Sequence, residues 1–98
     1  MSKFKFSVVT KNEAFKVLIG KGESGDSMQT HLSDKDAFLL VITGKIAFRL
    51  GDDYQQLGAG DHIQIAAENA HSFDVLADCE LQLILDSKAK ISFVEQVG

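Results

Sequence analysis

Apolar side chains in this chain recur mostly with a period of two residues, and short glycine- or aspartate-containing segments interrupt the pattern. A period of two places successive side chains on opposite faces of a β-strand, whereas an amphipathic helix needs a period of 3.6. Short strands with turn signals about 8–12 residues apart indicate an all-β sandwich or barrel. The predicted strands lie at residues 15–20, 28–32, 38–42, 45–50, 54–57, 62–66, 71–76, 80–85 and 90–95.

Two stretches stand out among these strands. Residues 38–42 are all apolar, which is expected of a strand that is buried on both faces. Further along, Gly58 and Gly60 predict a tight turn, because glycine adopts backbone conformations that other residues resist. A short strand and a loop of small residues follow, and His71 then opens the next strand. A histidine in that position is expected to point into a barrel or cleft.

The composition of the chain argues against nucleic-acid-binding, secreted and membrane-spanning proteins. A chain of 98 residues predicts one domain with a modest core. The net charge of −4 and the scattered lysines and arginines indicate that nucleic acid is not a partner. The N-terminus lacks the apolar run of a signal peptide, and no stretch approaches the roughly 18 apolar residues of a membrane span. Cys79 is the only cysteine, so no intrachain disulfide forms. We therefore expect a cytoplasmic protein with no membrane partner.

The order of these elements over about residues 28–85 resembles a small single-domain cupin. Residues 41–45 match the end of the first cupin motif at Gly44, and residues 60–71 match the second motif from Gly60 to His71. Ala66 and Ala70 stand where this second motif usually has proline. The resemblance implies one cupin-like domain over residues 1–98, with the all-β fold called a double-stranded β-helix or jelly-roll barrel.

The resemblance also implies where a metal would bind. Metal-binding cupins use two histidines and a glutamate of the first motif and the histidine of the second. In this chain His31 and His71 match two of these positions, while Gln29 replaces a histidine and Ala37 replaces the glutamate. A third ligand would have to be Gln29 or Asp36, and Asp36 is one residue out of phase with the glutamate position.

Two main functions follow. The first is the binding of an unidentified small molecule without a cofactor, and the second is a metal-dependent oxygenase or isomerase that holds Fe, Mn, Zn or Ni through His31 and His71. A third is a structural or regulatory module, and whether the chain is an enzyme stays open. The residues expected to line the ligand cavity are His31, His71, Gln29, Phe38, Leu40 and Phe73.

A short all-β chain has exposed strand edges, so we expect a homodimer formed by strand exchange or sheet extension. The N-terminal strand at residues 3–9 is the element expected to pair with the second copy. His62 alternates with Ile63, and we expect it to face away from the core, at the surface or at a dimer contact.

Overall fold

The computed structural model describes residues 4–94. Every regular secondary-structure element in this range is a β-strand. This confirms the all-β prediction. Residue 3 of the predicted N-terminal strand and residue 95 of the predicted last strand lie outside the described residues. Within the described range no helix is long and apolar enough to cross a membrane. The strands are β1 (Lys5–Lys11), β2 (Phe15–Gly22), β3 (Ser27–Ser33), β4 (Ala37–Leu50), β5 (Asp53–Gly58), β6 (His62–Ile65), β7 (His71–Asp86) and β8 (Ile91–Phe93).

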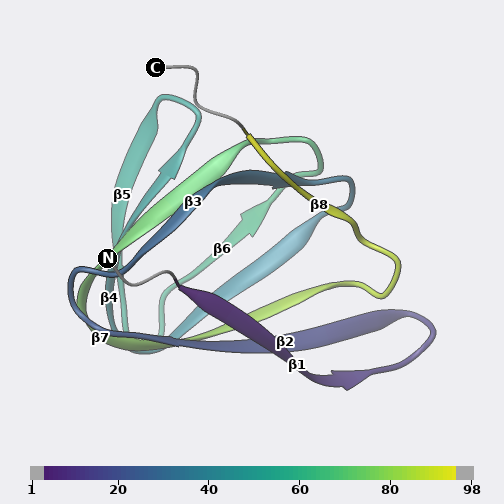
Figure 1. Cartoon of the computed structure of the whole chain (residues 1–98), viewed down its shortest axis with the longest axis horizontal. Helices are drawn as coiled ribbons and strands as arrows, with labels where there is room; N and C mark the ends of the chain where they lie inside the picture. The colour runs from purple at the N-terminus through teal and green to yellow at the C-terminus, as the bar shows by residue number, and fades with distance from the viewer. Residues whose placement is uncertain (1–3, 95–98) are drawn as a thin grey trace.

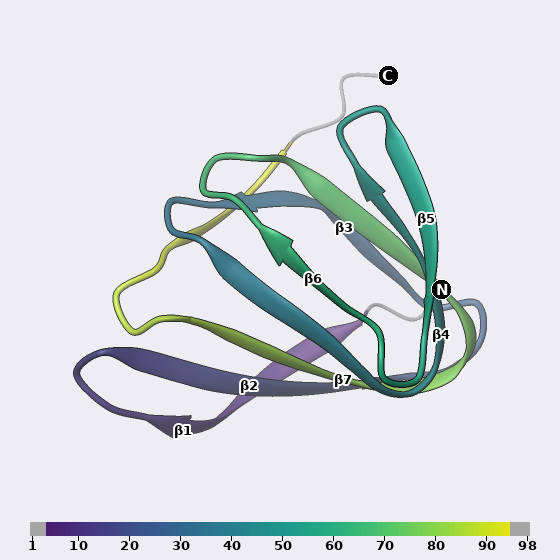
Figure 2. The same ribbon diagram turned by 180° about the vertical axis from the view of Figure 1, so that it is seen from behind.

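β4 and β7 are long strands that bend instead of ending. The prediction of separate strands at residues 38–42 and 45–50 is wrong, and so is the prediction of separate strands at 71–76 and 80–85. The pairing of β4 with β7 shifts register between Val41 and Ile46, and Gly44 within this segment has a φ of +85°. A bulge with a left-handed glycine bends a strand while the pairing continues on either side. Figures 1 and 2 show both strands curving round the same end of the molecule.

The bent strands join two antiparallel sheets. Sheet I has the order β1, β2, second half of β7, first half of β4, β6. Sheet II has the order β5, second half of β4, first half of β7, β3, β8. Two sheets that share two bent strands form the jelly-roll arrangement predicted from the sequence.

The hydrophobic core lies between the inner faces of the two sheets, because alternate residues of each strand point inward. Phe4, just before β1, packs on the inner face of β2, where a Cβ on Gly20 would lie only 2.3 Å from the Phe4 ring. Glycine at this position therefore makes room for an aromatic ring. The residues buried in this core include Phe4, Leu39, Val41, Ile46, Phe48, Leu57, Ile65, Phe73, Val75, Cys79, Leu81 and Leu85.

The glycine turn predicted between residues 58 and 61 connects β5 to β6. The Gly58 amide donates to the Asp61 carboxylate at 2.8 Å, and the Asp61 amide donates to the Gly58 carbonyl at 2.9 Å. Gly60 has a φ of +89°, and its amide donates to the Val41 carbonyl at 2.8 Å. The turn is thus fixed to the corner of β4, and it starts β6 in register with the first half of that strand.

Candidate ligand-binding site

The antiparallel pairing of β3 with β7 places His31 directly opposite His71. The two side chains are buried, with exposed fractions of 5% and 7%, and their ring centroids are 4.2 Å apart in an edge-to-face arrangement. The two histidines that the sequence singled out therefore lie in contact on the inner face of sheet II.

Each imidazole is held by a carbonyl group two residues before it. Nδ1 of His31 donates to the Gln29 carbonyl at 2.7 Å, and Nδ1 of His71 donates to the Asn69 carbonyl at 3.0 Å. A carbonyl oxygen only accepts, so the proton of a neutral ring must be on Nδ1 and the lone pair on Nε2. Among the described residues, no group donates to either Nε2, and no buried side-chain nitrogen or oxygen lacks a partner. Each Nε2 therefore remains an acceptor that none of residues 4–94 uses.

Burial favours the neutral form of both rings. It lowers the pKa of His31, and the hydrogen bond to the Gln29 carbonyl opposes this effect. Burial also lowers the pKa of His71; the bond to the Asn69 carbonyl opposes it, and repulsion from a protonated His31 adds to it. With both pKa values below the ordinary value of about 6.5, the pair is mostly uncharged at neutral pH.

Strand register extends the site across sheet II. Residues that are paired across antiparallel strands share a face, so a continuous row can be followed from β5 to β8: Asp53, Leu50, His71, His31 and Phe93. A second row on the same face runs Gln55, Phe48, Phe73 and Met28.

Aromatic rings flank the histidine pair. The Phe48 ring stacks on His71 at a centroid distance of 5.7 Å, and the half-exposed Phe93 ring lies 5.7 Å from His31. The pair therefore has apolar walls on both sides.

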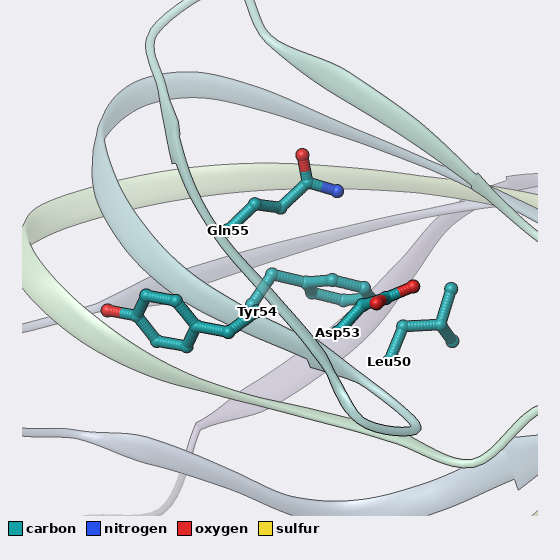
Figure 3. Close-up of a pocket in the computed structure, with 5 residues that line it drawn as sticks. Leu50, Asp53, Tyr54 and Gln55 are labelled. Atoms are coloured by element: carbon teal, nitrogen blue, oxygen red, sulfur yellow. The ribbon is translucent and has the colours of Figure 1, made fainter.

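A cavity of about 290 Å³ opens beside these rows at the β4–β5 hairpin. Its lining residues are Phe48, Leu50, Asp53, Tyr54 and Gln55. Figure 3 shows Asp53 and Leu50 extending to one side of the hairpin, whereas Tyr54 points to the other side. Leu50 pairs with both Asp53 and His71, so the cavity adjoins the histidine pair through one strand.

The other residues that the sequence predicts in the wall of the ligand cavity lie in different parts of the structure. Phe73 is buried in the core one row behind the histidines. Gln29 is exposed, because the register of β3 shifts between Met28 and His31 and breaks the alternation. Phe38 and Leu40 were expected in the wall, but they lie on the outer face of sheet I, because Leu39 takes the inward position.

The residues at this place do not fit a catalytic metal centre. Such centres use at least three protein ligands, commonly two histidines and a carboxylate. Ala37 is buried but carries only a methyl group, while the exposed Asp36 accepts a hydrogen bond from the Ala67 amide at 2.8 Å. Within residues 4–94 no three histidine, cysteine, aspartate or glutamate side chains cluster in a way that would hold a metal ion.

Sequence reasoning missed Asp53, Gln55 and Phe93. The period of two in β5 does place Asp53 and Gln55 on the same face as the buried Leu57. Their proximity to His71 depends on the register of the β4–β5 and β4–β7 pairs, and no residue pattern in the sequence specifies it.

Comparison with known proteins identifies the fold. No protein-family model matches this chain, and no curated protein matches it in sequence. Solved structures do match in shape. A conserved protein with a double-stranded β-helix domain from Klebsiella pneumoniae has a TM-score of 0.84 at 17% identity, covering 96% of this chain and 86% of that one. A cupin superfamily protein from Desulfitobacterium hafniense has a TM-score of 0.78 at 13% identity, covering 85% and 76%. The chain therefore has the cupin fold.

Proteins with quite different names share this fold. KdgF from Halomonas has a TM-score of 0.80 at 16% identity, covering 87% of this chain and 79% of that one. A mutant of salicylate 1,2-dioxygenase from Pseudoaminobacter salicylatoxidans, in complex with gentisate, has a TM-score of 0.84 at 12% identity. That match covers 95% of this chain and 30% of the dioxygenase. Since one fold carries several functions, the function of this chain has to be argued from its own side chains.

Proposed function

We propose that this cupin fold binds a small organic molecule that carries hydrogen-bond donors and no negative charge, next to His31 and His71. The observation that carries the proposal is the pair of Nε2 lone pairs. Each Nδ1 donates to a backbone carbonyl, so each ring keeps Nε2 as an acceptor that none of the described residues uses. A hydroxyl or amino group of a ligand supplies the matching donor.

The charge of the surrounding face supports this choice of ligand. In the two rows across sheet II, Asp53 is the one residue with a formal charge. An anionic ligand would meet neutral imidazoles and a carboxylate, with no lysine or arginine in these rows to pair with it. The cavity of about 290 Å³ is close to the lower end, about 300 Å³, of common ligand sites, which suits a compact molecule.

The test follows the ¹⁵N signals of the histidine rings by NMR. The probes are myo-inositol as an uncharged polyol, ethanolamine as a cation and benzoate as an anion, each up to about 100 mM. We expect inositol or ethanolamine to move the Nε2 signals of His31 and His71, while benzoate leaves them in place. His62 is exposed and serves as the internal control, since its signals should not respond. A response of the pair to benzoate, or to none of the three probes, would refute the proposal.

The metal-dependent oxygenase or isomerase is the competing hypothesis, supported by the two histidines alone. Metal analysis of protein purified without chelator decides between them. The binding proposal expects far less than one divalent ion per chain. About one ion per chain that is lost in His71→Phe and retained in His62→Phe would replace it with the metal-dependent function.

A further inference from the structure

A second cavity, of about 750 Å³, opens where the turn between β1 and β2 meets the turn between β7 and β8. Figures 1 and 2 show these two turns side by side at one end of the molecule. The cavity lies at an edge of sheet I, because β1 is an edge strand, whereas the histidine pair belongs to sheet II. Its lining residues are Lys11, Asn12, Glu13, Ser87 and Lys88.

Hydrogen bonds hold the two turns together. The buried Ser87 donates twice across the gap, from its hydroxyl to the Glu13 carbonyl at 2.8 Å and from its amide to the Ala14 carbonyl at 3.2 Å. The Lys16 ammonium donates to the Ala89 carbonyl at 3.2 Å. The walls of the cavity are therefore fixed before any ligand arrives, which lowers the entropic cost of binding.

The lining of this cavity is rich in hydrogen-bond donors. The side-chain oxygen of Asn12 accepts from the Ala14 amide at 2.8 Å, which fixes the carboxamide and leaves its NH₂ group as a donor that no acceptor among residues 4–94 engages. Lys11 and Lys88 add two ammonium groups, and Glu13 adds one carboxylate. The lining thus has a net charge of opposite sign to that of the whole chain, which is −4.

Like charges are also placed opposite each other beside this cavity. Lys11 pairs with Lys16 across β1 and β2, and Lys16 pairs with the buried Leu85, so both lysines lie on the inner face of sheet I. Like charges at directly opposite positions destabilise a strand pair. Two ion pairs form among residues 4–94, and neither includes Lys11, Lys16 or Lys88. A bound anion would offset this repulsion.

We propose that this cavity, which we call the lysine cavity, binds a small phosphorylated molecule, with the phosphate group between Lys11, Lys88 and the NH₂ group of Asn12. Lysine binds phosphate as a point charge, and a phosphate monoester carries about −1.5 to −2 charges at pH 7, which matches two ammonium groups. The volume lies within the range of about 300–1,000 Å³ of common ligand sites, so the organic part fits beside the phosphate. The Glu13 carboxylate accepts hydrogen bonds and therefore favours an organic part that carries hydroxyl groups.

The lysine cavity and the histidine pair would take different ligands. The histidine pair offers acceptors and no positive charge, whereas the lysine cavity offers donors and two positive charges. Binding at one place can therefore be measured separately from binding at the other.

The first experiment titrates the chain with glycerol 3-phosphate up to about 20 mM, at a constant ionic strength of about 50 mM, and follows ¹⁵N signals by NMR. We expect the Asn12 and Lys88 amide signals and the Asn12 side-chain signal to move, and glycerol alone to leave them in place. Lys11→Gln and Lys88→Gln should each weaken the affinity about tenfold, because each removes a charged donor to the phosphate. Lys21→Gln is the matched control, since its 77% exposed side chain removes the same charge from β2 outside the cavity.

The second experiment uses thermal melting to separate a binding role of Lys11 from a structural one. Lys11→Gln removes the like charge opposite Lys16, so in phosphate-free buffer it should melt no lower than the wild type. Addition of 20 mM glycerol 3-phosphate should raise the Tm of the wild type by at least about 2 °C more than that of Lys11→Gln, because a ligand stabilises only the state that binds it. A lysine that only supported the fold would give a lower Tm in the variant and equal rises on adding the phosphate.

Three results would overturn the proposal. These are wild-type Asn12 and Lys88 signals that do not move, affinities that both cavity variants leave unchanged, and a Lys21→Gln variant that binds as weakly as the cavity variants, which would show attraction by net charge alone. The ring signals of His31 and His71 report on the other site and should stay in place, so failure here leaves the proposed function of the histidine pair standing.

Discussion

Replacement of Gly44 by alanine tests how tightly the corner of β4 packs against β7. At Gly44 φ is +85°, and a Cβ built there would lie 2.2 Å from the Asp78 carbonyl oxygen and 2.6 Å from the Cys79 Cα. Left-handed backbone costs alanine about 1–2 kcal/mol. The crowded atoms belong to the backbone of β7 and cannot rotate away, so overpacking adds about 1–3 kcal/mol. Gly44→Ala should therefore lower the free energy of unfolding by about 2–5 kcal/mol.

Gly60→Ala is the matched control for this substitution. Gly60 has a nearly identical φ of +89°, but a Cβ built there meets no atom within 4 Å. It should show only the backbone cost of about 1–2 kcal/mol. The difference between the two variants then isolates the contact between the strands at the corner.

Urea denaturation followed by far-UV circular dichroism measures both free energies, since the chain has no tryptophan. A domain of this size loses about 4–8 °C of Tm per kcal/mol, so Gly44→Ala should melt at least about 4 °C below Gly60→Ala. Equal losses of stability in the two variants would refute the reasoning, because they would show that the corner opens to accept a methyl group at no cost.

Two further predictions concern stability. Burial lowers the pKa of His31 in the folded state, so below about pH 6.5 the unfolded chain binds more protons than the folded chain. The free energy of unfolding should therefore fall between about pH 6.5 and the folded pKa, by up to about 1.4 kcal/mol per pH unit. Urea titrations between pH 7.5 and 4.5 should show a shallower loss for His31→Gln than for wild type or His62→Gln; identical slopes would contradict the assignment. Arg49 and Asp74 form an ion pair between half-exposed side chains, so Arg49→Ala should change the free energy of unfolding by less than about 1 kcal/mol, and a larger loss in the same urea assay would contradict this.

The sequence specified the strands better than their faces. In β6 and in the first half of β7, polar and apolar residues alternate, so the inward set can be read directly. Residues 38–42 are all apolar, so polar residues do not mark which side chains face outward. Either alternate set of this run could therefore point inward. Phe38 and Leu40 were assigned to the wrong side for this reason. Residue identity could not distinguish them from Leu39, since only the pairing with β6 and β7 fixes the face.

The two long strands were divided for a related reason. A Thr–Gly pair at residues 43–44 is a common turn signal, and it also suits a bulge at a corner. Which of these forms depends on whether a partner strand continues past the glycine. β7 does continue past Gly44, so the chain bends there without turning back. The contact of His31 with His71 was easier to expect, because the cupin motifs relate these two positions across the sequence.

The buried histidine pair links the proposed binding to pH. A ligand donor needs the Nε2 lone pair, and protonation of either ring removes that acceptor. Burial keeps both rings neutral at pH 7, and each ring disfavours a charge on the other. Affinity should therefore be constant near neutral pH and fall as the pH drops through the folded pKa values.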